Sequence, residues 1–431
     1  MKKTLFAALL ALGLTSPTAL LAQTVTYGLF GYAGMTTGTT GGAGGTSVTV
    51  STGTALMAAI RGNTGNAPLT IYVDGVITPA NTPSSYDKIE IKDRNNISII
   101  GVGTRGEFDG IGLYVRRASN IIIQNLNIHH VLAGPKDCIG IEGPANHIWV
   151  DHCELHNDYQ GVNKDYYDGL LDAKDDTEYL TFSWNYLHDA WKASLSGYTE
   201  SDVFNRKITY HHNRFENIES RLPLLRGGQS HVFNNYYKDI FSTGINSRVN
   251  ACVKIENNYF ENVKNPYVSA YSSVVGYGDI LGNYLASNCQ FQYSSDTFPL
   301  GACTLALPYT YGTALNAVAD VPAVVIANAG VGHLTPTTPT ATAAAKHSAD
   351  FRAYPNPFKG STSFDLTVKQ RGNVRITLYN VAGVKVADIV NEAMTAGVHT
   401  IKYTNEALRP GLYFCVVKTA TQSLTRKLVV E

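Results

Sequence analysis

Short apolar segments that end in one asparagine recur through much of the chain. Each is a run of β-branched or aromatic residues followed by Asn and another apolar residue. Copies lie at 121–126, 180–186, 208–213, 231–236, 253–259 and 280–284, and a histidine replaces the Asn in 148–153. The repeated positions are Asn125, His152, Asn185, Asn213, Asn235, Asn258 and Asn283, separated by 27, 33, 28, 22, 23 and 25 residues. This variable spacing indicates a coil whose connecting loops differ in length.

Stacking explains why such segments recur. A strand of about five residues cannot bury its apolar face alone, but strands stacked about 4.8 Å apart form one continuous core. Asparagine side chains stacked at one turn then hydrogen-bond to buried turn backbone that would otherwise lack partners. We therefore predict an all-β fold built on a right-handed parallel β-helix. A β-propeller or a β-sandwich is the alternative, and it requires hairpin turns at half this period.

The N-terminus has a different character from the repeats. A basic start precedes an apolar run at 5–14 and then small residues as far as Ala22. This pattern is typical of a secretory signal peptide at 1–22, and the apolar run is too short to span a membrane. We expect no transmembrane segment later in the chain. The protein is then secreted or held at the outer cell surface, with its β-helix domain at 23–334.

The C-terminal part also differs from the repeats. A segment rich in Thr, Pro and Ala at 335–348 predicts a linker, because it is extended and cannot pack a core. Short alternating strands are expected beyond it, at 374–380, 383–386 and 411–417. About eighty residues of such strands predict a small β-sandwich at 349–431. A carbohydrate-binding module of the same shape is the alternative.

Charge and cysteine content narrow the possible partners. The 34 basic and 34 acidic residues balance, so no basic surplus points to nucleic acid. Export permits disulfides among six cysteines, whose spacing matches no zinc pattern. Cys289 and Cys303 are the favoured pair, because they bracket a loop-like stretch. The cysteines are Cys138, Cys153, Cys252, Cys289, Cys303 and Cys415.

Six charged residues carry the candidate chemistry. Most of the long intervals between them are near one turn of the coil, so their side chains are expected on one face of neighbouring turns. Asp168 and Asp172 share parity on a strand, and Pro223 prevents regular pairing between the two arginines, which a bend then brings together. Three carboxylates favour a hard cation, best Ca²⁺. Ordinary surface acids and ion-paired arginines are the alternative. The six are Asp137, Asp168, Asp172, Lys192, Arg221 and Arg226.

Five motifs in a specific order carry a family resemblance from about Val48 to Tyr284. They lie at 99–103 (IIGVG), 148–153 (IWVDHC), 168–172 (DGLLD), 191–195 (WKASL) and 221–228 (RLPLLRGG). This part of the chain resembles the pectate lyases of polysaccharide lyase family 1. The resemblance implies a calcium-binding site, a catalytic base and two contacts to the substrate carboxylate. The calcium ligands are Asp137, Asp168 and Asp172, and the base is Arg221. The carboxylate contacts are Lys192 and Arg226, and Lys192 is also counted as catalytic.

One position departs from the family pattern. Some members carry a further acid two residues before the position of Asp137, where this chain has Pro135. Calcium is therefore expected to bind weakly until the substrate supplies oxygen ligands.

The resemblance implies β-elimination on α-1,4-linked polygalacturonate, with 4,5-unsaturated oligogalacturonates as products. Calcium and a cationic side chain stabilise the negative charge that develops beside the substrate carboxylate. A guanidinium group normally keeps its proton, so an arginine base favours an alkaline optimum. A pectin lyase acting on methylated polymer and a non-catalytic polygalacturonate-binding surface protein are the alternatives.

The C-terminal part resembles the sorting domain of type IX secretion substrates. The resemblance rests on the Pro-Asn-Pro opening at 355–357, the Leu-Tyr-Asn strand with its following glycine, and the Gly-Leu-Tyr-Phe strand at 411–414. It implies a secretion machinery as partner and passage across an outer membrane. We expect a monomer.

Other polar features receive structural interpretations. The doublets His129–His130 and His211–His212 are expected to be structural rather than zinc ligands. Asp175 and Asp176 are similar to the paired acids of a polygalacturonase, but no companion acid supports that interpretation. Five tyrosines are expected either to line a sugar cleft or to pack in the coil: Tyr166, Tyr167, Tyr198, Tyr267 and Tyr271.

Overall fold

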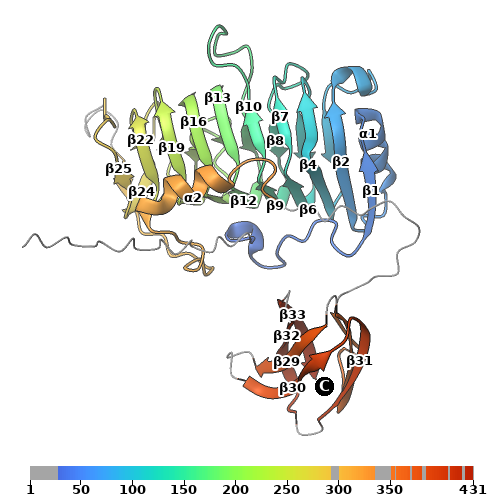
Figure 1. Cartoon of the computed structure of the whole chain (residues 1–431). Helices are drawn as coiled ribbons and strands as arrows, with labels where there is room; N and C mark the ends of the chain where they lie inside the picture. Colours follow the sequence, from blue (N-terminus) through green and yellow to red (C-terminus); the bar gives the residue numbers. More distant parts are fainter. Residues whose placement is uncertain are drawn as a thin grey trace, which may run out of the picture. The chain divides into compact units, whose positions relative to one another are not determined.

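The chain divides into two units, Met1–Thr338 and Pro339–Glu431. A computed structural model describes residues 28–292, 300–334, 351–354, 356–368, 371–380, 385–405, 408–419 and 423–430 (Figure 1). The predicted signal peptide and linker lie outside the described residues.

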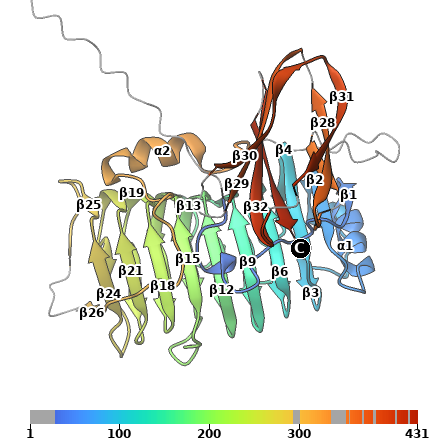
Figure 2. The same ribbon diagram turned by 90° about the horizontal axis from the view of Figure 1, so that it is seen from below.

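The first unit is a parallel coil whose described strands form three stacks, in which successive turns pair in parallel (Figures 1 and 2). The first stack contains β7 (Asn127–His129), β10 (Glu154–His156), β13 (Tyr186–Lys192), β16 (Arg214–Ser220), β19 (Tyr236–Ile240), β22 (Tyr259–Val263) and β25 (Tyr284–Leu285). The second contains β1 (Thr46–Val50), β2 (Leu69–Ile77), β4 (Ile97–Asp109), β6 (Ser119–Gln124), β9 (Ala145–Asp151), β12 (Thr177–Ser183), β15 (Lys207–His211), β18 (Gln229–Phe233), β21 (Cys252–Glu256), β24 (Tyr277–Leu281) and β26 (Gly301–Ala302). The third contains β3 (Ile89–Lys92), β5 (Leu113–Arg116), β8 (Ile139–Glu142), β11 (Leu171–Lys174), β14 (Leu195–Ser196), β17 (Leu224–Arg226), β20 (Ile245–Arg248) and β23 (Tyr267–Val268). The predicted parallel β-helix is confirmed.

Apolar side chains fill the inside of the coil in columns, one residue from each turn. Fully burying each such side chain contributes about 1.5–3 kcal/mol. One column consists of stacked aromatic rings, Phe215, Tyr237 and Phe260, with interplanar angles of 9° and 11°. The column from the second stack is Ile71, Ile99, Ile123, Val150, Phe182, Tyr210, Val232 and Ile255.

The asparagine repeat forms a hydrogen-bonded ladder where the chain leaves the second stack. In each step the Oδ1 of one Asn accepts the backbone N–H of the Asn one turn earlier, at 2.9–3.0 Å. Every turn therefore satisfies a buried backbone donor of its neighbour. The ladder residues are Asn185, Asn213, Asn235, Asn258 and Asn283.

Two residues assigned to this column from the sequence lie one position earlier. Asn125 and His152 have left-handed backbone, with φ of 56° and 50°, and align with the residue that precedes each ladder Asn. Cys153 takes the ladder position and donates its N–H to Asn185 Oδ1 at 2.9 Å. The prediction was wrong for this pair because Asn favours left-handed turn positions as well as ladder positions.

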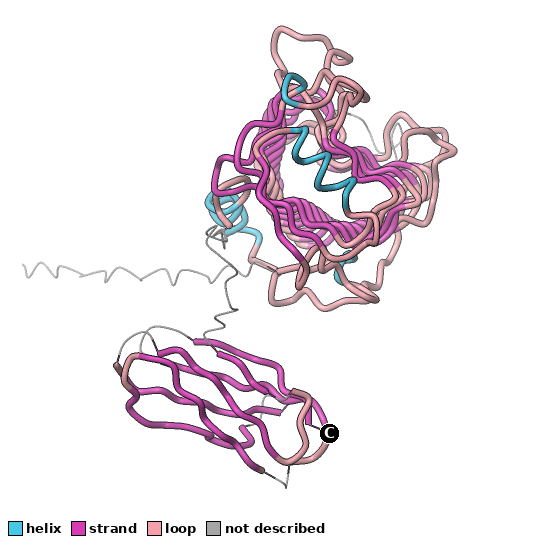
Figure 3. The backbone as a smooth tube through the Cα atoms, turned by 90° about the vertical axis from the view of Figure 1, so that its right-hand side faces the viewer, coloured by secondary structure: helices cyan, strands magenta, loops and turns pink. Residues whose placement is uncertain are grey.

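Helices cover parts of the coil. Helix α1 (Gly53–Gly62) lies across one end, as the view along the coil in Figure 3 shows, and buries Leu56, Met57 and Ile60. These residues join the apolar core and close it at that end. Helix α2 (Val321–Asn328) packs Val321 and Val325 against the first stack. No described helix has the length and apolar character needed to cross a membrane.

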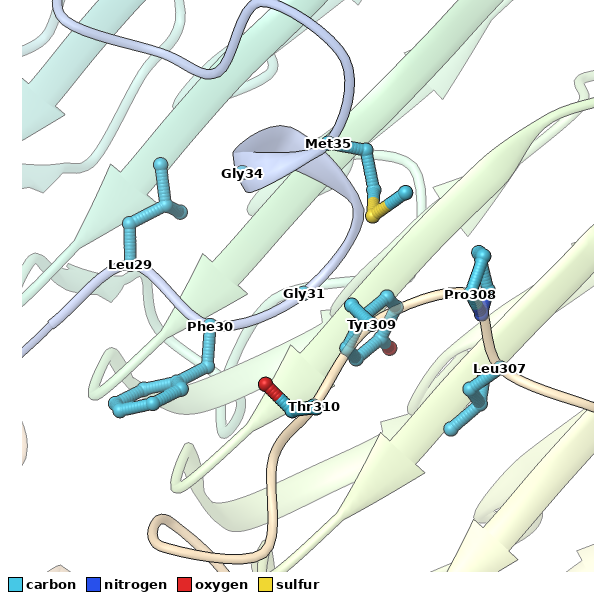
Figure 4. Close-up of a pocket in the computed structure, with 9 residues that line it drawn as sticks. All are labelled: Leu29, Phe30, Gly31, Gly34, Met35, Leu307, Pro308, Tyr309 and Thr310. Atoms are coloured by element: carbon cyan, nitrogen blue, oxygen red, sulfur yellow. The ribbon is translucent and has the colours of Figure 1, made fainter. Parts of the chain in front are cut away.

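Two irregular segments, around 29–35 and 307–310, lie against the second stack and border an open hollow of about 640 Å³ (Figure 4). The N-terminal segment, which contains the 3₁₀ turn Tyr32–Gly34, donates the backbone N–H of Tyr32 to Thr209 Oγ1 at 3.1 Å. The hydroxyl of Tyr309, in the segment around 307–310 of the same unit, forms a hydrogen bond with the same Thr209 hydroxyl at 2.9 Å. These contacts hold both segments onto β15.

The disulfide joins Cys252 to Cys303, with their Cα atoms 6.1 Å apart. The predicted pair Cys289–Cys303 is therefore wrong. Strand β26 pairs with β24, which pairs with β21, so the coil brings Cys303 beside Cys252 across 51 residues. Cys289 instead packs against the core of the coil.

The second unit is an antiparallel β-sandwich, as predicted. One sheet contains β27 (Phe351–Tyr354), β28 (Ser361–Val368) and β31 (Gly397–Thr404). The other contains β29 (Gly372–Asn380), β30 (Lys385–Met394), β32 (Gly411–Lys418) and β33 (Ser423–Val430). Phe364, Ile376 and Cys415 lie in the core between the sheets.

We predict that Asn235→Ala destabilises the coil by roughly 2–4 kcal/mol, because it removes hydrogen-bond partners from the buried Asn213 N–H and Tyr210 C=O. Chemical denaturation measures the change. Asn205→Ala, in an exposed loop, is the control and is expected to change stability by less than about 0.5 kcal/mol. Equal stabilities of the two variants would contradict a structural role for the ladder.

We predict an acid-labile coil because of His212. Burial lowers its pKa to about 4, although the hydrogen bond between its ring and Asn316 acts to raise it. The unfolded chain binds a proton below about pH 6.5, so the contribution of His212 is complete above that pH and is lost as the pH falls towards 4. Denaturation curves at several pH values are expected to show a loss of about 2–3 kcal/mol from this residue at pH 4.5. His212→Asn should reduce the slope between these limits, and an unchanged slope would contradict the assignment.

Candidate functional site

The candidate site lies on the outer face of the third stack. Along β11 the side chains of Leu171 and Ala173 point into the core, so those of Asp172 and Lys174 point outward. In register with Asp172 are Gly140 and Tyr114 on the preceding turns. A Cβ at residue 140 would lie 2.3 Å from the Tyr114 ring, so only glycine at this position leaves room for the ring.

Two carboxylates are buried at the centre of this face. Asp137 Oδ1 accepts the Gly169 N–H at 3.1 Å, and Asp172 Oδ1 accepts the Leu195 N–H at 2.9 Å. Lys174 Nζ lies 2.9 Å from Asp137 Oδ2 and 3.4 Å from Asp172 Oδ2. Asp172 Oδ2 receives no hydrogen bond from the described residues.

Burial disturbs the protonation of both acids. It raises the pKa of Asp137 to about 7, with a further contribution from the Asp172 charge. Burial also raises the pKa of Asp172, although Lys174 and Arg221 oppose it. For Lys174, burial alone would lower the pKa, but the two carboxylates outweigh it and the pKa is raised. The two carboxylates therefore need a cation to stay ionised together.

The third predicted acid, Asp168, faces two predicted cations. Its Oδ1 lies 3.2 Å from Lys192 Nζ and 4.0 Å from Arg221 Nη1. Asp168 is in the turn before β11, so the expectation that it shares a strand with Asp172 was wrong. The turn brings it to the same site, because its N–H bonds to the Lys136 carbonyl on the preceding turn.

Lys192 and Arg221 come from adjacent turns. Lys192 ends β13 and pairs with Ser220, the last residue of β16. Arg221 follows directly with a left-handed φ of 68°, and its side chain is about one quarter exposed. An exposed guanidinium in a left-handed position beside a carboxylate fits a functional role better than a packing role.

Arg226 lies on the same outer face and is the last residue of β17. Its Nη1 donates to the Gly197 carbonyl at 2.5 Å. Arg248 is in register with it on β20. Burial and neighbouring arginines lower the pKa of Arg226, and they lower that of Arg248 to about 10. These residues form a cationic row suited to an anionic polymer.

The donor set fits a hard cation. Asp137, Asp168 and Asp172 offer only carboxylate oxygens, which Ca²⁺ prefers. Asp172 Oδ2 is buried and accepts no hydrogen bond from the part of the chain that the structure describes, and a Cβ at residue 169 would lie 2.4 Å from Asp172 Oδ1. Glycine at that position thus leaves room around the carboxylate.

The other polar predictions have mixed outcomes. His211 and His212 are buried in the coil, and their ring Nδ1 atoms lie 2.9 Å apart. Tyr198 and Tyr271 are 56% and 57% exposed, so a ligand can reach them, whereas Tyr267 packs against the core. Asp175 and Asp176 border the buried Arg206, which receives its ion pair from Asp202.

Sequence reasoning missed Lys174 and Arg248. Both have a recognisable signal, since Lys174 shares parity with Asp172 on one strand and Arg248 lies 22 residues after Arg226, a step that also occurs in the asparagine repeat. Asp165, which lies 3.0 Å from Lys192 Nζ, was also missed. It lies in an irregular loop, where no periodic pattern in the sequence predicts which way a side chain points.

Comparisons with known proteins agree with this geometry. A pectate lyase family model matches residues 2–334, and a model of the secretion system C-terminal sorting domain matches 352–431. A pectate trisaccharide-lyase of Bacillus licheniformis is 50% identical over 310 residues, 72% of this chain and 88% of the relative. Pectate lyase A of Aspergillus niger is 37% identical over 330 residues, 76% of this chain and 94% of the relative.

Solved structures give the same picture. A pectate lyase from Bacillus sp. N165 in complex with trigalacturonate superimposes with a TM-score of 0.66 at 41% identity, covering 72% of this chain and all of that one. Pectate lyase C from Erwinia chrysanthemi, solved at pH 9.5 with 30 mM Ca²⁺, gives a TM-score of 0.60 at 28% identity, covering 71% and 97%.

We predict that Lys174→Met destabilises the chelator-treated protein by about 3–5 kcal/mol at alkaline pH, because two buried carboxylates lose their cation. Added Ca²⁺ is expected to restore more stability to this variant than to the wild type. Thermal unfolding with chelator and with Ca²⁺ measures both effects, with the exposed Lys92→Met as control. Equal calcium responses in all three proteins would contradict a cation site at these carboxylates.

Proposed function

The chain belongs to the pectate lyase family, and from that premise we propose that it cleaves α-1,4-linked polygalacturonate by calcium-assisted β-elimination. The contact of Asp168 with both Lys192 and Arg221 is the observation that carries the proposal. It joins an acid suited to a hard cation with two cations suited to a uronate carboxylate. The trigalacturonate complex of the Bacillus sp. N165 relative supports this substrate.

The proposed reaction removes the proton at C5 of a galacturonate unit. The C5–H electron pair becomes the C4–C5 double bond, and the C4–O bond breaks with its electrons on the departing oxygen. Solvent returns a proton to that oxygen. The products are a 4,5-unsaturated oligogalacturonate and a chain with a new hydroxyl end. No oxidant or second substrate is needed.

Arg221 is the proposed base. Its side chain is partly exposed and stands beside Asp168, on the face where the substrate would lie. Lys192 and Arg226 are proposed to hold the substrate carboxylate, and their positive charges would stabilise the enolate-like charge that follows loss of the C5 proton. Arg248 extends this cationic row by one turn.

Asp137, Asp168 and Asp172 are the proposed calcium ligands. When bound, Ca²⁺ supplies positive charge that acidifies the proton next to the uronate carboxylate. Pro135 leaves the protein with few ligands of its own, so substrate oxygens are expected to strengthen binding. The Erwinia chrysanthemi relative solved with Ca²⁺ supports the choice of cation.

Elimination from methylated pectin is the second candidate activity. It has less need of a calcium site, so the three acids favour the unmethylated substrate. A non-catalytic polygalacturonate-binding protein is disfavoured by the presence of Arg221, Lys192 and Arg226 together. The relative named a pectate trisaccharide-lyase supports trimers as a main product.

Export completes the proposal. We assign 1–22 as signal peptide, 23–334 as catalytic domain, 335–348 as linker and 349–431 as the sorting domain. The match of 352–431 to a secretion sorting model supports passage through a secretion machinery. The protein is then secreted, or retained at the outer cell surface, as a monomer.

We predict that Arg221→Ala lowers the elimination rate roughly 100- to 1,000-fold or more while the fold is retained. The ultraviolet absorbance of the unsaturated product on polygalacturonate, at alkaline pH with Ca²⁺, measures the rate. Chelator should abolish the wild-type signal, and Arg105→Ala, in an exposed ion pair with Asp74, is the control. A rate maximum near pH 5, or full activity of Arg221→Ala, would contradict the role of Arg221.

A further inference from the structure

Three histidines from consecutive turns stack on the outer face of the first stack, whereas the carboxylate site lies on the third. His129, His156 and His188 are in register on β7, β10 and β13. Their ring centroids are 4.8 and 4.6 Å apart, with interplanar angles of 19° and 12°. The spacing is that of the coil, so the backbone itself holds the imidazoles together.

His188 is held between two carboxylates. Its Nδ1 lies 2.6 Å from Asp189 Oδ2, and its Nε2 lies 3.3 Å from Glu154 Oε1. When Nδ1 carries the proton and donates it to Asp189, the Nε2 lone pair faces a carboxylate oxygen. Two acceptors in this arrangement need a proton or a metal ion between them. Around zinc, a histidine usually binds the ion through one ring nitrogen and donates the N–H of the other to a carboxylate or carbonyl oxygen or to water.

His156 completes the group. It lies two residues after Glu154 on β10, so both side chains share a face. Neither ring nitrogen of His156 has a hydrogen-bond partner among the described residues. One ligand atom from each of Glu154, His156 and His188 lies within 4.8 Å of the others.

The spacing suits a tetrahedral ion. With bonds of about 2.0–2.1 Å, neighbouring ligand atoms of tetrahedral Zn²⁺ lie roughly 3.3 Å apart. Glu154 Oε1 and His188 Nε2 already have this separation. The His156 and His188 rings are stacked 12° from parallel, so the His156 ring has to turn out of the stack before both can hold the same ion. In a neighbouring group, His129 and His130 are instead engaged with each other at 2.7 Å, and with Glu107 and Asp158.

A hollow of about 380 Å³ borders one of the three candidate ligands, His188, but neither Glu154 nor His156 lines it. Its lining also includes Asp189, Glu216 and Asp239. Glu216 in this lining is already paired with Arg214 and Lys238. Imidazole nitrogens together with one carboxylate prefer Zn²⁺ or a similar transition metal to Ca²⁺.

We propose that Glu154, His156 and His188 bind one divalent transition-metal ion, with Zn²⁺ as the probe, and that Asp189 orients His188. His156 is the last residue before the loop 157–170, which carries Asp165 and Asp168 to the third stack. The ion would link β10 to β13 at the base of that loop. Its role is stabilising, and it is independent of the proposed lyase activity.

Equilibrium dialysis of the full chain with Zn²⁺, in excess Ca²⁺ to occupy the carboxylate site, tests the proposal. We expect one Zn²⁺ per chain that His156→Gln and His188→Gln each weaken at least tenfold, while His399→Gln in the second unit leaves it unchanged. Asp189→Asn should weaken binding roughly 10- to 100-fold, as for other residues that orient a ligand. Cobalt(II) is expected to give visible absorption bands of a tetrahedral site in the wild type and not in His188→Gln.

Glu154→Gln separates a metal site from an ion pair. It keeps a hydrogen-bonding partner for His188 but loses the charged ligand, so Zn²⁺ affinity should fall while metal-free stability changes little. No bound Zn²⁺ in the wild type, or equal affinity in the wild type and all these variants, would overturn the proposal. Unfolding curves without metal show whether each variant is folded, so that lost binding is not mistaken for lost structure.

Discussion

Parallel stacking of successive turns, in register except for one shift between Val73 and Gly75 where β2 pairs with β4, is the constraint on which the rest of the structure depends. Because each strand pairs with its counterpart one turn away, like positions align in columns along the coil. Inward columns become the core, the turn column becomes the asparagine ladder, and outward columns become rows of charge. A carboxylate and two cations from three different parts of the chain thus meet at Asp168, Lys192 and Arg221.

The same constraint concentrates charge that would be unfavourable elsewhere. Asp137 and Asp172 are both buried, and burial raises the pKa of each; the Asp172 charge raises the pKa of Asp137 further, and the Asp168 charge raises that of Asp172. Lys174 relieves this in the structure described here. Positive charges on the neighbouring turns are also disfavoured, because burial and neighbouring arginines lower the pKa values of Arg226 and Arg248. The proposed anionic polymer with a bridging cation would offset both.

Periodicity made much of the fold predictable from sequence. The repeated apolar segments predicted the coil, and the motif order predicted the family. The misplacement of Asn125 and His152 arose because Asn suits two adjacent turn positions. The disulfide was missed because the register of the coil, rather than closeness in sequence, brings Cys252 to Cys303. Asp165 had no periodic signal, since it lies in an irregular loop.

A crystal structure of Arg221→Lys with trigalacturonate and Ca²⁺ tests the central claim most directly. We expect calcium between Asp137, Asp168 and Asp172, with a uronate carboxylate held by Lys192 and Arg226. Sugar bound elsewhere, for example in the hollow beside Tyr309, or calcium outside these three carboxylates, would contradict the account.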